Sequence, residues 1–366
     1  MLRSLLLVAV LAAAGCTGEA PAAAHAPNGV TDIKPDEHLV FFNTSAWLDE
    51  SGAHWQIPVH GWVYEPEDST FRRSVFETVL EEQFELEVTE ANEDIFARRL
   101  NLLIADNERN KNVAVQAAGQ HFVLPPSAES GQFSETLTIP AADVESHAEN
   151  GMLRITAVLG EHDDRSFEGI VKLVPPAGTS VISDIDDTVK ISGVLDKKTL
   201  LDYTFLREFE AAPGMARTYR DWSTQGASFH FVSSSPWQLY APLDEFLERE
   251  GFPWATFNLK LVRFRDETFL DLFKKGTDTK PKIIENILSR YPNRKFVLVG
   301  DSGEQDPEVY ANLMRSHPEQ IFCVLIRNVS DESPDNQRFT TLFGGFEANS
   351  WMLFDDPDLL PDVLAP

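Results

Sequence analysis

One stretch of the sequence decides the fold of the C-terminal half of this chain: Val181-Ile182-Ser183-Asp184-Ile185-Asp186-Asp187-Thr188. A short apolar run ends in two carboxylates that stand two residues apart and are followed by a hydroxyl. Apolar runs of this length are typical of buried parallel strands, and catalytic groups in open α/β sheets lie just past the carboxyl ends of such strands. Two carboxylates placed there repel each other. One could attack an electrophile, the other could move a proton, and a hard divalent cation could sit between them.

Beyond this stretch the sequence alternates between strand-like and helix-like segments. Such alternation is typical of a doubly wound parallel sheet, so we expect an α/β domain over residues 177–366. The boundary is marked by Val174-Pro175-Pro176-Ala177-Gly178. The expected strands are 180–184, 228–232, 256–262, 296–300 and 321–326, and the expected helices are 242–250, 280–290 and 307–315.

Residues 36–176 show a different pattern, the alternation of half-buried strands. Val59 and Val63 share one parity, whereas His60 and Tyr64 share the other. This pattern predicts an antiparallel β-sandwich that precedes the α/β domain as an accessory domain. Two segments break the alternation and predict an inserted helical hairpin. Their apolar residues recur at helical spacing: Phe76, Val79, Leu80 and Phe84 in the first helix, and Phe96, Leu100 and Leu103 in the second. Asn92 is the candidate N-cap of the second helix.

The composition limits what the protein can bind. The chain has 366 residues, 43% of them hydrophobic, which is enough for two domains with sizeable cores. Its net charge of −27 argues against nucleic acid as a partner, because the chain has no basic field to hold phosphates. The same charge argues against broad adhesion to an anionic membrane. An anionic substrate must therefore meet a local basic patch.

The N-terminus predicts export and lipidation. Met1-Leu2-Arg3 is followed by an apolar run and then by Ala13-Ala14-Gly15-Cys16, which resembles a bacterial lipoprotein box. We expect residues 1–15 to be a signal peptide, Cys16 to carry lipid, and residues 16–35 to form a tether. The protein would then be a membrane-anchored lipoprotein facing the periplasm or the cell exterior. An ordinary secretion signal or a short core segment are the alternatives, since the run is too short to span a bilayer.

Polar residues follow four elements of the expected parallel sheet. Asp184 and Asp186 end the first strand, Ser233 follows the second, Lys280 begins a helix, and Asp301 follows the fourth strand. Phosphoryl transfer needs such a set. Asp184 would attack phosphorus, Asp186 would move the proton, and Ser233 and Lys280 would hold the phosphoryl oxygens. Asp301 would join Asp184 in holding Mg²⁺.

Each of these pieces also has a simpler interpretation. An acid after a strand is often a loop or capping residue, Ser233-Ser234-Ser235-Pro236 is typical of a turn, and a lysine at a helix start is usually solvated. Gly300-Asp301-Ser302-Gly303 also resembles the nucleophile loop of chymotrypsin-like proteases. That fold is all-β, so the α/β context disfavours a protease. The ordered combination, rather than any single piece, carries the prediction.

The order of these motifs resembles the haloacid dehalogenase superfamily of phosphatases. Over residues 178–330 a closer resemblance is to the lipin-related phosphatidate phosphatases, first known from a yeast actin-patch protein. This resemblance implies Mg²⁺-dependent hydrolysis of phosphatidate to diacylglycerol and phosphate through an aspartyl phosphate. The stretches that carry it are Ser183-Asp184-Ile185-Asp186-Asp187-Thr188-Val189-Lys190, Phe229-His230-Phe231-Val232-Ser233-Ser234-Ser235-Pro236-Trp237-Gln238-Leu239-Tyr240 and Gly300-Asp301-Ser302-Gly303-Glu304-Gln305-Asp306-Pro307-Glu308.

The resemblance also implies a role for each site residue. Asp184 is the expected nucleophile and Asp186 the expected acid and base. Lys282 lies two residues from Lys280, and Thr279 stands where the family often has histidine, so either lysine could contact phosphate. The expected phosphate contacts are Thr188, Ser233, Ser234 and Lys280, and the expected Mg²⁺ ligands are Asp184, Asp186 and Asp301.

Residues 260–282 form a basic stretch in an otherwise acidic chain, with seven basic and four acidic side chains. This stretch is either a solvated loop or a rim that attracts an anionic headgroup. Apolar residues nearby could form a lip for an acyl chain: Trp237, Phe269, Leu270, Leu272 and Phe273.

Two other functions stay open at this stage. The first is a phosphatase of the same superfamily that acts on another lipid phosphate or on a soluble phosphomonoester. The second is a non-catalytic surface lipoprotein that binds phosphate esters. A binder needs no second acid beside Asp184, which disfavours the second alternative.

Overall fold

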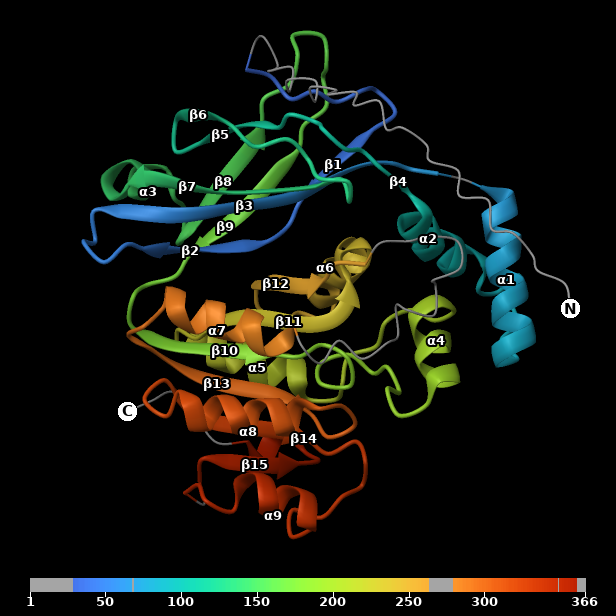
Figure 1. Cartoon of the computed structure of the whole chain (residues 1–366), viewed down its shortest axis with the longest axis vertical. Coiled ribbons are helices and arrows are strands. Elements are labelled where there is room, and N and C mark those ends of the chain that lie inside the picture. Colours follow the sequence, from blue (N-terminus) through green and yellow to red (C-terminus); the bar gives the residue numbers. More distant parts are fainter. Residues whose placement is uncertain (1–28, 68, 263–278, 348, 361–366) are drawn as a thin grey trace, which may run out of the picture.

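A computed structural model describes residues 29–67, 69–262, 279–347 and 349–360 (Figure 1). These residues form an N-terminal nine-stranded sheet and a C-terminal six-stranded sheet. The expected signal peptide, Cys16 and most of the tether lie outside the described residues. Within the described part of the chain, no helix combines the length and the apolar character needed to cross a bilayer.

The C-terminal sheet is parallel throughout and has the order β12-β11-β10-β13-β14-β15. Strand β10, which Asp184 follows directly, lies in the middle of the sheet, where the strand order reverses direction. Crevices at such a reversal are the usual ligand sites of open α/β sheets. The strands are β10 (Gly178–Ser183), β11 (Ser228–Pro236), β12 (Ala255–Lys260), β13 (Arg294–Asp301), β14 (Ile321–Arg327) and β15 (Trp351–Phe354).

Helices cover both faces of this sheet, because successive side chains of each strand point to opposite sides. Val181 joins an apolar cluster with α4, α5 and α6, whereas Ile182 joins another with α7, α8 and α9. The helices are α4 (Lys197–Phe205), α5 (Met215–Thr224), α6 (Tyr240–Arg249), α7 (Lys280–Arg290), α8 (Asp306–Ser316) and α9 (Gln337–Phe343), with short 3₁₀ turns η1 (Trp237–Leu239) and η3 (Pro357–Leu359).

The expected parallel α/β architecture is therefore confirmed. All five predicted strands and all three predicted helices are present at the predicted places. The prediction missed α4, α5, α9 and β15, although the buried residues Met215, Tyr219 and Trp222 of α5 recur at helical spacing.

The N-terminal sheet differs from the expected antiparallel sandwich. Its nine strands form one continuous hydrogen-bonded network, because β2 pairs antiparallel with β3 and parallel with β9. Strands from both branches nevertheless bury their apolar side chains in one core. The strands are β1 (His38–Phe41), β2 (Thr44–Leu48), β3 (His54–Glu65), β4 (Asp106–Asn107), β5 (Ala114–Ala117), β6 (Gln120–Val123), β7 (Gln132–Pro140), β8 (Met152–Ala157) and β9 (Glu168–Leu173).

The predicted helical hairpin is present as α1 (Thr70–Phe84) and α2 (Glu93–Ile104), and a further short helix, α3 (Ala141–His147), follows β7. Ser69 caps α1 by accepting the N–H of Arg72. Asn92 does precede α2, as expected, but its side chain accepts the N–H of Thr89 instead of capping the helix.

The hairpin packs against the C-terminal region and not against the core of its own sheet. Phe76 of α1 contacts Phe205 of α4, with ring centroids 6.3 Å apart. Arg99 of α2 is buried and donates hydrogen bonds to the carbonyls of Tyr203 (3.2 Å) and Thr204 (2.5 Å) at the end of α4. Figure 1 shows α1, α2 and α4 side by side, beyond the ends of the parallel strands.

A second contact joins the two regions through aromatic side chains. Phe42 stacks on Trp237 at a centroid distance of 4.2 Å, and the Tyr291 hydroxyl donates to Ser45 Oγ at 2.8 Å. Trp237 is only 7% exposed. Its predicted place in an acyl-chain lip is therefore wrong, because the ring fills the interface between the two regions. Phe269, Leu270, Leu272 and Phe273 lie outside the described residues.

This shared core makes a prediction about stability. Phe96 of α2 is fully buried in the apolar cluster that includes α4 and η1, whereas Phe71 of α1 is 78% exposed. Replacing Phe96 with Ala should lower the free energy of unfolding by about 3–5 kcal/mol, and Phe71→Ala should change it by less than about 0.5 kcal/mol. Urea unfolding followed by circular dichroism measures both. Equal stability of the two variants would show that the hairpin does not share the core.

Candidate active site

Three buried carboxylates meet at the carboxyl edge of the parallel sheet. Asp184 follows β10, Asp301 ends β13, and Asp306 begins α8. One oxygen from each lies within 4.8 Å of the others, and all three residues are at most 1% exposed. Gly300 permits this approach, because a side chain there would collide with the Asp306 carboxylate. The fold thus brings Asp184 together with two acids that lie more than a hundred residues further along the chain.

The donor set of this acid cluster fits a hard divalent cation. Oδ2 of Asp184 and Oδ2 of Asp301 are buried and have no hydrogen-bond partner within the part of the chain that the structure describes. Buried polar atoms without a partner are rare in folded proteins and call for an explanation such as a bound ion. Carboxylate oxygens without histidine or cysteine nearby are the ligands that Mg²⁺ prefers. Asp184 and Asp301 fit their predicted place at the cation site, together with Asp306.

Lys280 provides the positive charge of the cluster. Its Nζ lies 3.0 Å from Oδ1 of Asp184 and also contacts Oδ1 of Asp306. Burial by itself lowers the pKa of Lys280, but the two carboxylates outweigh burial and raise that pKa well above its usual value. Lys282, the alternative phosphate contact, is exposed on the same helix. The geometry therefore favours Lys280 over Lys282.

The electrostatics of the cluster are unfavourable without a further cation. Burial raises the pKa of Asp184 well above its usual value, and the charges of Asp306 and Asp301 add to the shift while Lys280 opposes it. The pKa of Asp301 is raised for the same reasons, burial first. Three carboxylates facing one lysine leave excess negative charge in a place with little water.

Asp186 lies in a different environment, although it is only two residues from Asp184. Lys190 Nζ is 2.8 Å from Oδ1, the Ser192 hydroxyl donates to Oδ1 at 2.8 Å, and the Ser235 hydroxyl donates to Oδ2 at 2.8 Å. Burial alone would raise the pKa of Asp186, but Lys190 and these hydrogen bonds lower it to about 2. The Asp186 carboxylate is not among the three acids that approach one another within 4.8 Å.

The remaining predicted residues surround Asp184 and Asp186. Ser233 Oγ lies 3.3 Å from Oδ2 of Asp186 and accepts the N–H of Ser235 at 3.0 Å. Thr188 is fully buried, and its hydroxyl has no hydrogen-bond partner among the described residues. Ser234 is half-buried at the end of β11. Of the predicted phosphate contacts, Lys280 thus lies beside Asp184 and Ser233 beside Asp186, whereas the roles of Thr188 and Ser234 stay predictions.

A rigid loop borders the cluster on one side. The Asp187 carboxylate accepts three backbone N–H groups, those of Ser192 (2.7 Å), Gly193 (3.0 Å) and Val194 (2.6 Å). The next residue, Leu195, is 61% exposed. Its Cδ2 lies 3.1 Å from the position that a Cβ of Gly303 would occupy, and Oδ1 of Asp301 lies at the same distance from that position. An apolar side chain therefore stands in solvent beside the acid cluster.

Ser302 has a structural role that excludes the protease interpretation. Ser302 is 1% exposed, and its Oγ accepts the N–H groups of Val329 (2.9 Å) and Ser330 (3.1 Å). No histidine hydrogen bonds to Ser302 among the described residues. A serine nucleophile needs an accessible hydroxyl with a base beside it.

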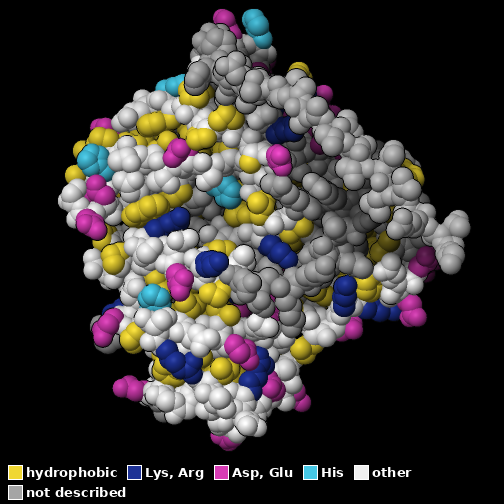
Figure 2. Space-filling view, viewed as in Figure 1, with side chains coloured by type: hydrophobic (Ala, Val, Ile, Leu, Met, Phe, Trp, Pro, Cys, Tyr) yellow, Lys and Arg dark blue, Asp and Glu magenta, His cyan; other side chains and the backbone are white. Residues whose placement is uncertain are grey.

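Most of the predicted basic stretch, residues 263–278, lies outside the described residues. Of its described basic members, Lys260 ends β12, Lys280 contacts two carboxylates of the acid cluster, and Lys282 is exposed on α7. Figure 2 shows lysine and arginine side chains mixed with acidic ones on the face in view. The hypothesis of a basic rim therefore stays a prediction.

Several residues of the site were missed by the sequence analysis. Asp306 belongs to the acid cluster, Lys190 and Ser235 hold Asp186, and Asp187 fixes the adjacent loop. Asp306 had a usable signal, because it is an acid at the start of a helix directly after the Asp301 loop. Lys190 had no usable signal in the sequence. It lies four residues after Asp186, but that spacing predicts a contact only within a helix, and this segment is a turn.

The parallel sheet, the acid cluster at its edge and the buried lysine form an arrangement that suits phosphoryl transfer. Comparison with known proteins is more specific. Residues 179–328 match the family described as phosphatidate phosphatase APP1, catalytic domain. Phosphatidate phosphatase APP1 of Saccharomyces cerevisiae is 32% identical over 186 residues, covering 49% of this chain and 31% of the yeast protein.

Two further similarities are weaker or less informative. An uncharacterized protein of Schizosaccharomyces pombe is 30% identical over 191 residues, covering 50% of this chain and 31% of that protein. A solved structure of a Thermotoga maritima protein assigned as a beta-phosphoglucomutase aligns with 49% of this chain and 95% of its own, at 13% identity. Its TM-score of 0.29 is too low to support an inference. The chain spans about a third of the length of the curated relatives it matches. These matches support a phosphatase catalytic domain at residues 179–328.

The crowding of the acid cluster makes a prediction about metal binding. Saturating Mg²⁺ should raise the melting temperature of the parent protein, because a ligand that binds only the folded state stabilises it. Asp301→Asn should lose this increase. Without metal the same variant should melt no lower than the parent, because it relieves repulsion among buried carboxylates. Differential scanning calorimetry with and without Mg²⁺ measures both effects. Asp335→Asn, at an exposed acid, is the control, and an undiminished Mg²⁺ shift in Asp301→Asn would contradict the assignment.

Proposed function

We propose that this protein is a Mg²⁺-dependent phosphatidate phosphatase, which hydrolyses phosphatidate to diacylglycerol and phosphate through an aspartyl phosphate. The observation that carries the proposal is the arrangement of Asp184, Lys280 and the acid cluster within the segment that matches the APP1 catalytic family. The substrate is inferred from the yeast relative, which is a phosphatidate phosphatase. The chain's own side chains supply the chemistry described below.

In the first half of the reaction, one carboxylate oxygen of Asp184 attacks phosphorus and the ester P–O bond breaks. The departing alkoxide takes a proton from Asp186. Lys280 and the hydroxyls of Ser233 and Thr188 hold the phosphoryl oxygens. Bound by Asp184, Asp301 and Asp306, Mg²⁺ would supply charge neutralisation at the phosphoryl group.

In the second half, water attacks phosphorus of the aspartyl phosphate, and Asp186 accepts the proton of that water. The P–O bond to Asp184 breaks, which releases phosphate and restores both carboxyl groups to their starting states. The pairing with Lys190 suits this step, because it keeps Asp186 ionised as a base. The arrival of an anionic phosphate next to Asp186 raises its pKa, which favours the protonated form that the first half needs.

The surroundings of the site favour a substrate with an apolar portion. Ser192 hydrogen bonds to Asp186, the group that protonates the leaving alcohol, and the rigid loop from Ser192 ends at exposed Leu195. An exposed apolar side chain beside the acid cluster can contact acyl chains but offers nothing to a small polar alcohol. This observation favours a lipid phosphate over a soluble phosphomonoester, which is the second candidate substrate class.

The test is phosphate release from dioctanoyl phosphatidate and from glycerol 3-phosphate, with Mg²⁺ and with excess EDTA. We expect Mg²⁺-dependent release with a higher kcat/KM for dioctanoyl phosphatidate. Asp184→Asn should abolish turnover, because an amide cannot form the acyl phosphate. Asp186→Asn should lower kcat by about 10²–10⁴-fold, the usual value of general acid–base catalysis. Turnover by Asp184→Asn at the parent rate would overturn the mechanism, and a preference for glycerol 3-phosphate would favour the soluble substrate class. Phosphate-ester binding without any release would favour the non-catalytic lipoprotein.

We further propose that the mature protein is anchored through lipid on Cys16 and faces the periplasm or the cell exterior. The support is the sequence Ala13-Ala14-Gly15-Cys16 after an apolar run. A tether after Cys16 would let a body of net charge −27 stay near an anionic bilayer that repels it.

Membrane fractionation of cells that express the Cys16→Ser variant tests the anchor. The parent should sediment with membranes, because the several acyl chains of a processed lipoprotein hold firmly. The variant should move to the soluble fraction, or keep its uncleaved signal peptide. Cleavage at the same site with full retention in the membrane fraction would contradict lipidation.

A further inference from the structure

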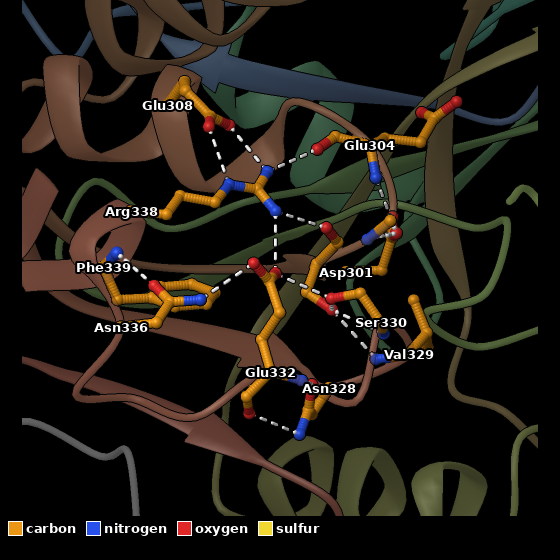
Figure 3. Close-up of polar contacts among 12 residues, drawn as sticks. Asp301, Glu304, Glu308, Asn328, Val329, Ser330, Glu332, Asn336, Arg338 and Phe339 are labelled. Carbon is orange, nitrogen blue, oxygen red and sulfur yellow. Dashed lines mark hydrogen bonds and ion pairs between the residues drawn. The ribbon is translucent and has the colours of Figure 1, made fainter.

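Arg338 lies on α9, ten residues beyond the segment that matches the catalytic family. Its side chain is 27% exposed, yet its guanidinium makes five hydrogen bonds, which equals the full number of donors that arginine has. Figure 3 shows the guanidinium between the carboxylates of Glu308 and Glu332 and the loop of Asp301. No motif in the sequence singles this residue out.

Two of the five hydrogen bonds reach the backbone of the acid loop, which we define as residues 301–304. Nη1 donates to the carbonyl of Ser302 at 2.7 Å, and Nη2 donates to the carbonyl of Glu304 at 2.8 Å. A charged donor makes stronger hydrogen bonds than a neutral one. The planar fork of arginine also fixes the directions of both carbonyls at once.

One peptide group links Arg338 to the cation site. The carbonyl of the Ser302–Gly303 peptide accepts from Arg338, and the N–H of the same peptide donates to Oδ1 of Asp301 at 2.7 Å. Carbonyl and N–H point in opposite directions from a planar peptide. By fixing the carbonyl, Arg338 therefore aims the N–H at Asp301. Its charge also polarises the peptide, which strengthens the hydrogen bond to the carboxylate.

This hydrogen bond decides which oxygen of Asp301 is free. Oδ1 accepts the N–H of Gly303 and also the N–H of Glu304 at 3.0 Å, whereas Oδ2 is buried and has no partner among the residues that the structure describes. The carboxylate is thus held by one oxygen while the other remains available for a cation. A rotation of the acid loop would change which of the two Asp301 oxygens is hydrogen bonded and which is available to a cation.

The rest of the network holds Arg338 in place. Nε and Nη2 bind the Glu308 carboxylate at 2.8 and 3.0 Å, and Nη1 binds Glu332 at 3.0 Å. Glu332 in turn accepts from Ser330 and Asn336. Because two carboxylates flank the guanidinium, its charge is balanced locally and its position does not depend on the acid cluster.

We propose that Arg338 is a positioning residue of the cation site, which orients Asp301 through the Ser302–Gly303 peptide. The inference rests on the proposed function only in assigning a divalent cation to the acid cluster. It extends the functional unit beyond residue 328, into a segment that the family match does not include.

Direct measurement of Mg²⁺ binding by titration calorimetry tests the proposal on the full chain. Arg338→Met removes all five donors but keeps an apolar stem, and should weaken Mg²⁺ binding roughly 10–100-fold, as is typical for partners of metal ligands. Arg338→Lys keeps the charge without the fork and should lie between parent and Arg338→Met. The matched control is Arg315→Met. Arg315 of α8 also binds α9, through the carbonyl of Leu342, but hydrogen bonds to no residue of the acid loop.

Melting temperatures separate positioning from general stability. If Arg338→Met and Arg315→Met melt alike without metal but only Arg338→Met binds Mg²⁺ weakly, the proposal stands. Parent-like Mg²⁺ affinity in Arg338→Met, or equal weakening in both variants, would overturn it. If Arg338→Met does not fold, Arg338→Lys decides, and parent-like affinity in that variant would overturn the role of the fork. A parent protein that binds no Mg²⁺ would overturn this proposal, whereas one that binds Mg²⁺ without phosphatase activity would overturn only the proposed function.

Discussion

The ion pair on which the site depends is Lys280 with Asp184 and Asp306. Charges buried this deeply are unfavourable unless they are paired and hydrogen bonded, so each member needs the other two in place. Lys280 begins α7, Asp184 follows β10 and Asp306 begins α8. The ion pair therefore ties two helix starts to the central strand end. The strand order provides the space for a ligand, because the reversal at β10 leaves room between the connections on either side.

The N-terminal region takes part in this arrangement and is more than an appendage. Its helical hairpin shares an apolar core with α4, and Arg99 binds the last carbonyls of that helix. The helix α4 follows directly on the loop that Asp187 holds beside the acid cluster. A change in how the hairpin packs against α4 would therefore shift the loop beside the acid cluster. The family match covers residues 179–328 and does not include the hairpin.

The sequence predicted the sheet and the strand-end residues well for a physical reason. Buried parallel strands are local apolar runs, and polar residues at their ends must meet at one edge. Asp184, Ser233 and Asp301 follow from this rule, whereas Lys280 begins a helix and was predicted from its place in the ordered combination of motifs. Trp237 was mispredicted because an aromatic side chain near a site can be either exposed or buried. Contacts with Phe42 and His60, both far away in the sequence, decide between the two. The mixed pairing of the N-terminal sheet depends on a similarly distant contact, between β2 and β9.

Asp184 and Asp186 show why local sequence could suggest two roles but could not assign their environments. They are two residues apart, yet burial and like charges raise the pKa of Asp184 while Lys190 lowers that of Asp186 to about 2. Pairs of acids whose surroundings separate their pKa values are typical of sites that divide proton transfer from another task. Here the separation arises from two different partners. Lys190 keeps Asp186 ionised, as the proposed role of a base requires, whereas the carboxylates around Asp184 repel one another. In the proposed mechanism a bound cation would relieve this repulsion, so the affinity for the cation would come from the carboxylates that the fold holds close together.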